Sequence, residues 1–337
     1  MGSGPVLVTG AAGFIGSHVA ERLLNAGVAV VGVDNLNPYY DPALKRARRD
    51  RLVAQGMVFV EIELADRAGV EALFATHTPS HVVHMAAQAG VRHSLKDPHA
   101  YTDANITGFL TVLEGCRHTG VEHLVYASSS SVYGGNRRLP FSVSDSVDHP
   151  VSLYAATKKA NELMAHSYAH LYAMPSTGLR FFTVYGPWGR PDMAAYIFTR
   201  ALFEGTPIKL FNRGEMRRDF TYIDDIVEGV VRTIPEATAA NPDYDRMAPD
   251  PATSWAPHRV FNIGNDRGET LTDFVALLEE LTGREAILEL AEMQPGDVTE
   301  TWADVSALEA AVGFRPATPL RDGLARFVAW YREYHGV

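Results

Sequence analysis

Residues 6–16 read Val6-Leu7-Val8-Thr9-Gly10-Ala11-Ala12-Gly13-Phe14-Ile15-Gly16, a short apolar run followed by three glycines spaced three apart. The apolar run predicts a buried strand, and the amphipathic stretch 15–25 predicts a helix that begins at the last glycine. Gly10 permits a tight turn, Gly13 lets the backbone approach a phosphate, and Gly16 lets the helix pack closely on the strand. Because a helix N-terminus offers N–H groups and a positive dipole, this turn predicts a site for the diphosphate of a dinucleotide.

An acidic residue after the second predicted strand indicates which dinucleotide binds. Asp34 follows Gly16 by 18 residues and directly follows the apolar run 28–33. A carboxylate there accepts hydrogen bonds from both hydroxyls of the adenosine ribose and repels a 2′-phosphate. We therefore expect NAD rather than NADP. The structural alternative for Asp34 is a helix cap or a turn, so the prediction depends on the glycine turn as well.

The first half of the chain alternates short apolar runs with helical patterns. Buried strands are predicted at 6–8, 28–33, 58–60, 81–84 and 123–126, and amphipathic helices at 15–25 and 106–118. This alternation predicts an α/β fold with a Rossmann-type, doubly wound parallel sheet.

The second half predicts a smaller C-terminal substrate-binding lobe. We place the dinucleotide-binding domain at about 1–180 and the lobe at 181–337, with the two interleaved. The Pro-rich segment 235–258 is expected to be a surface excursion. A short strand at 259–263, a helix at 271–281 and a C-terminal helix ending near Tyr334 are expected to build the lobe over the carboxyl edge of the sheet, where open α/β folds bind ligands.

Composition limits the partners and the location. The net charge of −10 argues against nucleic acid as the main partner. No apolar run approaches the roughly 20 residues that a membrane span needs. Cys116 is the only cysteine, which suits a reducing compartment, so we expect a cytoplasmic protein. We expect no metal site.

A tyrosine and a lysine stand one helical turn apart in Tyr154-Ala155-Ala156-Thr157-Lys158. A free tyrosine has a pKa near 10, but an adjacent ammonium and a positive nicotinamide would both favour the phenolate. Tyr154 could then remove a proton from a hydroxyl as hydride leaves the same carbon. The serines 128–131 follow a predicted strand, and a hydroxyl there could orient the proton transfer. The alternatives are a helix-surface pair and ordinary loop serines.

The glycine spacing, the run His84-Met85-Ala86-Ala87 and the Tyr-x-x-x-Lys pattern together resemble the extended short-chain dehydrogenase/reductase family. The resemblance assigns the catalytic hydroxyl to Ser129, beside Tyr154 and Lys158. Glu63 stands where related enzymes often carry an Asp that faces the adenine. The cofactor contacts that the resemblance implies are Gly10, Gly13, Phe14, Ile15, Gly16, Asp34, Asn35, Glu63, Leu64, Ala86, Ala87, Tyr154 and Lys158.

The residues after Ser129 separate the reactions of this family. Enzymes that resemble nucleotide-sugar dehydratases carry Asp-Glu there, and decarboxylases carry Glu at the second place, whereas this chain has Ser130 and Ser131. Segments 34–45, 150–162, 177–194, 218–225 and 293–298 resemble UDP-glucuronate 4-epimerases. The resemblance implies reversible C4 epimerisation of UDP-glucuronate to UDP-galacturonate, through a transient 4-keto sugar and tightly bound NAD.

A physical constraint favours a uronate-specific pocket. A 4-keto uronate is a β-keto acid and loses CO₂ readily unless its carboxylate is held out of line with the carbonyl π system. Hydroxyl donors and a cation are needed for this, and the candidates are Ser130, Ser131, Thr183 and Arg190. A structural ion pair or a phosphate contact is the alternative for Arg190.

The resemblance also implies contacts for the UDP half of the substrate. It places Phe211 against the uracil, Arg218 on the diphosphate and Asp297 on the uridine ribose, with Gln294 where a second arginine is common. Arg213 and Arg217 lie nearby in sequence, and such a cluster is what an anionic ligand would require. The alternative for each is a solvated surface arginine, which is the interpretation that we prefer for Arg217.

Two other functions remain open at this point. One is 4-epimerisation of a neutral sugar such as UDP-glucose or UDP-galactose, and the other is a non-catalytic, NAD-sensing binding protein that would tolerate loss of Tyr154 or Lys158. The resemblance also implies a homodimer through the helices that contain 106–118 and 153–168.

Overall fold

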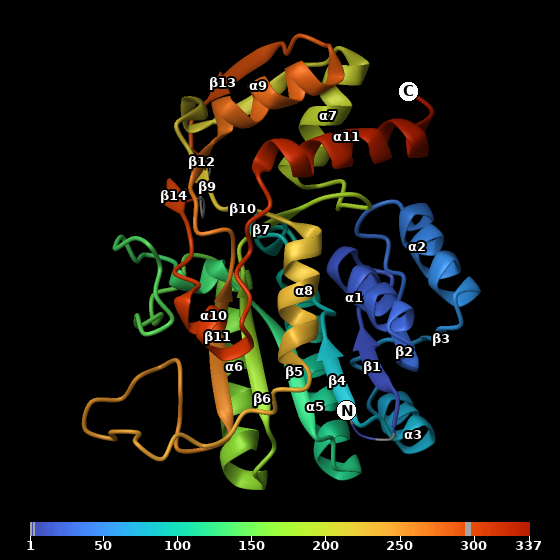
Figure 1. Ribbon diagram of the computed structural model, residues 1–337, viewed down its shortest axis with the longest axis vertical. Coiled ribbons are helices and arrows are strands. Elements are labelled where there is room, and N and C mark those ends of the chain that lie inside the picture. Colours follow the sequence, from blue (N-terminus) through green and yellow to red (C-terminus); the bar gives the residue numbers. More distant parts are fainter. Residues whose placement is uncertain (1, 3, 294–297) are drawn as a thin grey trace.

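The computed structural model describes residues 2, 4–293 and 298–337, which form an α/β fold with a large lower lobe and a smaller upper lobe (Figure 1). A parallel sheet of seven strands, in the order β11-β6-β5-β4-β1-β2-β3, forms the centre of the lower lobe. Its strands are β1 (Val6–Thr9), β2 (Val30–Asp34), β3 (Val58–Glu61), β4 (His81–His84), β5 (His123–Ser129), β6 (Ser176–Phe181) and β11 (His258–Ile263).

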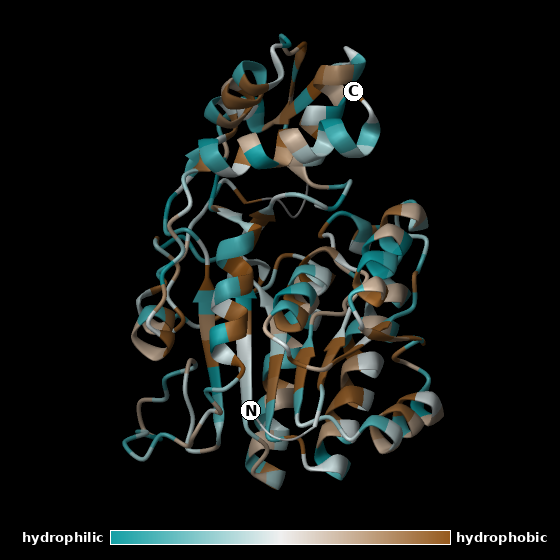
Figure 2. Ribbon diagram, turned by 45° about the vertical axis from the view of Figure 1, so that its right-hand side comes forward, coloured by the Kyte–Doolittle hydropathy of each residue, from teal (hydrophilic) through white to brown (hydrophobic). Residues whose placement is uncertain are grey.

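Helices follow the strands as the alternation of patterns predicts. In Figure 2 the helices around the sheet carry both hydrophilic and hydrophobic residues, as expected for elements with one face on a core and one face in solvent. They are α1 (Phe14–Asn25), α2 (Pro42–Ala54), α3 (Arg67–His77), α4 (Pro98–Tyr101), α5 (Gly108–Thr119), α6 (Leu153–Tyr172), α8 (Ile223–Thr233) and α10 (Ser306–Val312). The predicted Rossmann-type sheet is confirmed.

Two boundaries differ from the prediction, and both bear on the site. β5 runs on from the predicted end at 126 to Ser129, because it lies between β4 and β6 and pairs with β6 as far as Ser129. A π-helix, Thr102–Thr107, takes up the first two residues of the predicted helix 106–118, and α5 begins only at Gly108. A π-turn of this kind has no reliable sequence signature and is frequent at functional sites.

The upper lobe lies over the carboxyl ends of the strands, as expected (Figure 1). Among the described residues, short strands and the helices α7, α9 and α11 build it, and the pair β7 and β10 lies between it and the sheet. Its elements are α7 (Ala194–Glu204), β8 (Ile208–Phe211), β9 (Arg217–Arg218), β12 (Glu269–Thr270), α9 (Leu271–Thr282), β13 (Leu288–Ala291), β14 (Glu300–Thr301) and α11 (Leu320–His335); the linking pair is β7 (Thr183–Tyr185) and β10 (Phe220–Tyr222).

The strand expected at 259–263 does not belong to the upper lobe, and that part of the prediction is wrong. It is β11, which pairs in parallel with β6 from His258 to Ile263 and forms one edge of the main sheet. The chain therefore leaves the lower lobe after β6 and returns to it with α8 and β11. A local apolar run cannot indicate this, because it is equally compatible with either sheet.

Residues 235–257 link α8 to β11 as a long loop that projects from the body of the lower lobe (Figure 1); the segment expected as a surface excursion, 235–258, covers this loop and His258, the first residue of β11. Polar contacts hold it against the sheet and α6: Thr238 bonds Thr177, Ser254 bonds His166, and the Trp255 indole donates to His170 at 3.1 Å. In the described ranges of the chain, no helix has both the length and the apolarity that crossing a membrane takes.

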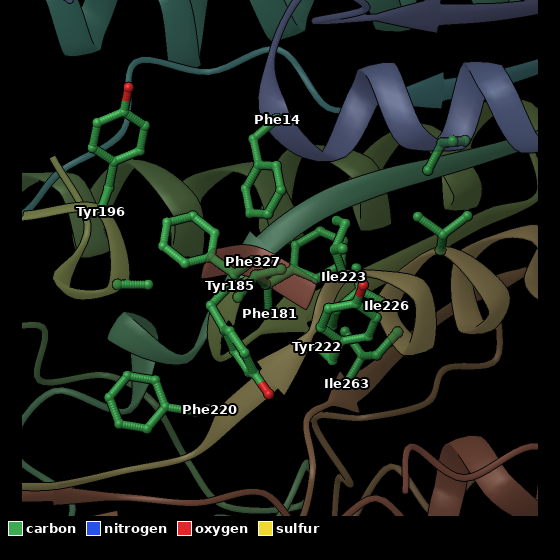
Figure 3. Close-up of a cluster of buried hydrophobic side chains, with 14 of the residues drawn as sticks. Phe14, Phe181, Tyr185, Tyr196, Phe220, Tyr222, Ile223, Ile226, Ile263 and Phe327 are labelled. Atoms are coloured by element: carbon green, nitrogen blue, oxygen red, sulfur yellow. The ribbon is translucent and has the colours of Figure 1, made fainter. Parts of the chain in front are cut away.

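The two lobes share one hydrophobic core, which fixes the upper lobe on the sheet. Figure 3 shows Phe14 from α1 beside Phe327 from α11, with Tyr196 from α7 nearby. Phe14 and Phe327 both lie against Gly189, since a Cβ placed there would be 4.0 Å and 3.7 Å from their rings. The space between the lobes is therefore framed by packed elements of both.

Candidate active site

A cavity of about 910 Å³ lies at the carboxyl edge of the sheet, within the usual range for small-molecule sites. It brings together every sequence-predicted site residue that the structure describes, whereas Gln294 and Asp297 lie outside the described residues. The predicted residues in its lining are Gly10, Gly13, Phe14, Ile15, Gly16, Asp34, Asn35, Glu63, Leu64, Ala86, Ala87, Ser129, Ser130, Ser131, Tyr154, Lys158, Thr183, Arg190, Phe211 and Arg218.

The glycine turn at one end of the cavity fits a diphosphate. Gly10 has a φ of +70°, and a Cβ there would lie 2.8 Å from the Ala86 nitrogen. A Cβ at Gly16 would lie 2.1 Å from the Gly10 carbonyl oxygen, so the helix can approach the strand only without a side chain. α1 begins without a side-chain cap, which leaves its first N–H groups for a ligand.

The carboxylate of Asp34 lies buried at the end of β2 beside this turn. It accepts hydrogen bonds from the backbone nitrogens of Ala12 at 3.2 Å and Leu36 at 2.9 Å. Burial raises its pKa, and the Lys45 ammonium, 4.0 Å from Oδ1, opposes that rise. Glu63 accepts a bond from the Asn35 amide at 2.6 Å on the same side of the cavity. This end fits an adenosine ribose and adenine.

The phenol of Tyr154 lies at the base of the cavity, on the first turn of α6. Ser152 caps this helix, with its hydroxyl accepting from the Ala155 nitrogen at 3.1 Å. Burial raises the pKa of Tyr154, whereas a hydrogen bond with Ser129 and the charge of Arg190 lower it. Ser129 and Tyr154 are therefore hydrogen-bonded to each other, and the role of Ser129 in orienting the proton transfer stays a prediction.

Lys158 lies one turn further along α6 and is almost fully buried. Burial lowers its pKa to about 8, and Glu162 on the next turn opposes that shift. Its ammonium donates to the Asn161 amide oxygen at 3.3 Å. The sequence predicts Lys158 as the cation that favours the phenolate, and the charge of Arg190, which lowers the pKa of Tyr154, acts in the same direction.

A buried amide network holds α6 in place, and sequence reasoning missed it. Asn105, on the π-helix, accepts from the Gln88 nitrogen at 2.8 Å and donates to the Thr157 hydroxyl at 3.0 Å. Asn161 donates to the Asn105 carbonyl at 2.6 Å. The network joins the loop after β4 to the helix that carries Tyr154 and Lys158, and no local sequence pattern connects these segments.

A buried ion pair supports the same helix from the side of the sheet. Arg180 on β6 makes a bidentate contact with Glu162, at 2.8 Å and 2.9 Å. Glu162 also accepts from the Ser128 hydroxyl at 2.7 Å. Although burial acts in the opposite direction, Arg180 keeps the pKa of Glu162 below its usual value.

The hydroxyl residues expected near a sugar lie beside Tyr154. Ser130 and Ser131 begin a 3₁₀ helix, Ser130–Tyr133, whose first turn is capped by the Ser129 hydroxyl accepting from the Ser131 nitrogen at 3.2 Å. Thr183 begins β7, and its nitrogen donates to the Asp219 carbonyl at 3.0 Å. All three serines and Thr183 face one cavity.

Arg190 also faces the cavity, and it forms an ion pair with Asp192. A structural ion pair was the alternative that the sequence left open for this residue. Its Nε donates to Asp192 Oδ1 at 3.0 Å and its Nη2 to Oδ2 at 2.5 Å. The Tyr39 hydroxyl donates to the same carboxylate at 3.0 Å. Neither Asp192 nor Tyr39 was singled out from sequence, because their contact spans 153 residues.

Phe211 and Arg218 line the far end of the cavity, in the upper lobe. The Arg92 guanidinium lies 4.2 Å from the centre of the Phe211 ring. Arg218 donates to the carbonyls of Val298 at 2.6 Å and Thr299 at 2.9 Å. Arg213, by contrast, is exposed and pairs with Glu292 at the surface.

These groups define a class of chemistry. A dinucleotide fold presents a half-buried tyrosine, a serine and a lysine to one cavity, and these groups can oxidise an alcohol and reduce the resulting carbonyl. The described residues fit NAD. Asp34 disfavours a 2′-phosphate, and the glycines of the turn, which lack side chains, let the backbone approach a diphosphate closely.

Comparison with known proteins gives the family. The NAD dependent epimerase/dehydratase family matches residues 6–248, and the chain belongs to this family. A protein of Rhizobium meliloti (strain 1021), named a probable UDP-glucuronate 4-epimerase, is 48% identical over 97% of this chain and 96% of its own length.

Solved structures show the same similarity. UDP-glucuronic acid 4-epimerase from Bacillus cereus, in complex with UDP-glucuronic acid and NAD, has a TM-score of 0.85 at 32% identity, covering 98% of this chain and 99% of that one. UDP-glucose 4-epimerase from Thermotoga maritima, with UDP-glucose, also has a TM-score of 0.85, at 30% identity and the same coverage. The chain is an NAD-dependent epimerase, an isomerase, and its cofactor is NAD.

Proposed function

We propose that the chain catalyses the reversible C4 epimerisation of UDP-glucuronate to UDP-galacturonate. The observation that carries this proposal is the set of groups facing the cavity beside Tyr154, namely Ser130, Ser131, Thr183 and Arg190. Three hydroxyls and one guanidinium suit a carboxylate on the sugar ring. The relative from Rhizobium meliloti and the Bacillus cereus structure support the same substrate.

The described lining also argues against dehydration. Its carboxylates are Asp34 and Glu63 at the adenosine end and Asp192, which is paired with Arg190. Ser130 and Ser131 cannot act as carboxylate acids or bases near neutral pH. Proton transfer at the sugar therefore falls to Tyr154, which suits epimerisation at a carbinol carbon.

The reaction would proceed through one proton shuttle. NAD, when bound, supplies the hydride acceptor and donor at the face of the sugar that Tyr154 addresses. Tyr154 takes the proton from O4, and Ser129 orients the hydroxyl by its hydrogen bond. Lys158 and Arg190 add positive charge that favours the phenolate. After the 4-keto sugar has turned over, Tyr154 returns the proton to O4.

The pocket must also protect the ketone from losing CO₂. Hydrogen bonds from Ser130, Ser131 and Thr183, with the charge of Arg190, would hold the carboxylate away from alignment with the C4 carbonyl. The same groups would hold the carboxylate both before and after the 4-keto ring turns over, because the carboxylate is the one charged group of the sugar ring.

The substrate is tested by comparing kcat/KM for UDP-glucuronate and UDP-glucose with the purified protein. We expect UDP-glucuronate to be preferred by at least about tenfold, since a charge-assisted contact contributes roughly 1.5–3 kcal/mol. Preference for UDP-glucose would favour a neutral-sugar 4-epimerase, to which the Thermotoga maritima structure is also similar. The lack of turnover with either sugar would favour an NAD-binding protein without catalysis.

The proposal includes a homodimer in the cytoplasm. Large apolar side chains on α5 and α6 are exposed, with Leu110 at 42%, Leu163 at 57% and Leu171 at 64%. A second copy of the chain would cover them, because exposed apolar residues gathered on neighbouring helices are typical of an interface. Cys116, the single cysteine, is buried and free, which is consistent with the cytoplasm.

A further inference from the structure

The turn between β7 and α7 carries Arg190, and its backbone is anchored from the lower lobe. Arg48 on α2 is fully buried and donates to the carbonyls of Trp188, at 3.1 Å and 2.5 Å, and of Gly189 at 3.1 Å. The same guanidinium donates to the Ala12 carbonyl in the glycine turn at 3.1 Å. Trp188 has a φ of +60°, so the turn has a backbone conformation that a free chain rarely adopts.

The side chain of Arg190 is fixed as well as its backbone. Asp192 accepts two hydrogen bonds from one edge of the guanidinium, and the Tyr39 hydroxyl donates to Asp192 Oδ2 at 3.0 Å. Tyr39 comes from the loop after β2 and packs on His93, with ring centres 4.8 Å apart. Arg190 therefore takes its position from a carboxylate that is itself held by a residue of the cofactor side of the cavity.

This arrangement leaves part of the guanidinium for a ligand. A guanidinium has five N–H donors, and Asp192 uses Nε and one Nη2 hydrogen. The ion pair with Asp192 does not use the N–H groups of Nη1. A bidentate partner also restricts the rotamers of a long side chain, so less conformational entropy is lost when a ligand binds.

We propose that Asp192 and Tyr39 are positioning residues that aim Arg190 at the carboxylate of the sugar, and so set how often the keto intermediate survives instead of losing CO₂. This inference rests on the proposed uronate substrate. In this proposal Asp192 and Tyr39 act on the sugar only through Arg190. Their contribution must therefore vanish when Arg190 is absent.

The test is a double-mutant cycle in Asp192→Asn, Arg190→Ala and the double variant, with Tyr39→Phe as a milder second route. Each protein is given UDP-glucuronate, and NMR records UDP-galacturonate and any decarboxylated product. Loss of CO₂ breaks the C5–C6 bond, a proton is added at C5, and a UDP-4-keto-pentose results; return of the hydride to C4 converts it to the alcohol, and both forms are counted below as UDP-pentose. We expect Asp192→Asn to lower kcat/KM about 10- to 100-fold and to release UDP-pentose, as loss of a charge-assisted hydrogen bond implies. Tyr39→Phe should act in the same direction, by about three- to tenfold.

In the Arg190→Ala background, Asp192→Asn should change kcat/KM by less than about twofold, because coupled residues are non-additive. Glu280→Gln is the matched control: it breaks an exposed pair with Arg321 and should leave rate and products unchanged. An effect of Asp192→Asn that is equally large with and without Arg190, or a fall in kcat with no UDP-pentose in either variant, overturns the proposal. An inactive wild type would instead contradict the proposed substrate.

Discussion

At the scale of single residues, the site depends on a phenol that is costly to ionise. Burial raises the pKa of Tyr154, and the groups that oppose this are Ser129 and Arg190. Lys158, with a pKa near 8, retains its charge at neutral pH and loses it as the pH rises through that value. The residues around Tyr154 therefore decide how readily it can act as a base.

Replacing Tyr154 by Phe removes the proton acceptor and nothing else from the cavity. We expect the epimerisation rate to fall by about 10²- to 10⁴-fold, the usual contribution of general acid–base catalysis. Bound NAD, measured by absorbance of the denatured extract, should be unchanged. Tyr168→Phe is the control, because Tyr168 lies on the same helix and bonds Glu114 away from the cavity. A Tyr154→Phe variant with near wild-type rate would contradict the assignment of the base.

At the scale of elements, the position of α6 depends on buried polar contacts on two sides. The amides of Asn105 and Asn161 tie it to the π-helix, and Glu162 ties it to Arg180 on β6. A buried ion pair of this kind contributes little against an apolar pair but is expensive to break on one side only. The helix is therefore held in one orientation by contacts that tolerate few substitutions.

Glu162→Gln should destabilise the fold by about 3–5 kcal/mol near neutral pH, since it leaves Arg180 buried without a counter-charge. The pKa of Glu162 is lowered by folding, so its stabilisation is present above the unfolded pKa of 4.5 and is lost as the pH falls below it. The difference in unfolding free energy between wild type and variant should shrink over that acidic range.

Chemical denaturation at several pH values measures this difference. Glu71→Gln serves as the control, because Glu71 pairs only at the surface of α3, with Arg67, and its loss should cost less than about 1 kcal/mol. A Glu162→Gln penalty as small as that of the control, or one that grows as the pH falls, would contradict the role given to the buried pair.

At the scale of the whole molecule, two lobes share a core and frame one cavity, and α5 and α6 present exposed leucines. If these leucines form a homodimer interface, Leu163→Glu should convert the dimer to a monomer, because a buried unpaired carboxylate is strongly unfavourable. Light scattering would then report about 37 kDa, the mass of one chain. Met247→Glu, at an exposed position in the loop 235–257, should leave the mass unchanged. A wild type that is already monomeric would contradict the dimer.

The sequence predicts those parts of the molecule that depend on residues close to one another in the chain. Gly10, Asp34, Tyr154 and Lys158 obey spacing rules within a turn or one βαβ unit, and all face the cavity. Asp192 and Tyr39 obey no such rule, because their contact depends on how the lobes pack. For the same reason the sequence places the predicted strand 259–263 in the wrong lobe: its composition fits any buried strand, and only the crossover decides its sheet.

The proposed reaction requires that a hydrogen leaves C4 of a uronate and returns to the same carbon. The direct measurement is NMR of UDP-glucuronate deuterated at C4, incubated with purified protein and no added cofactor. We predict UDP-galacturonate that keeps its deuterium at C4. Deuterium lost to solvent, or the absence of UDP-galacturonate from a protein that carries NAD, would contradict the claim.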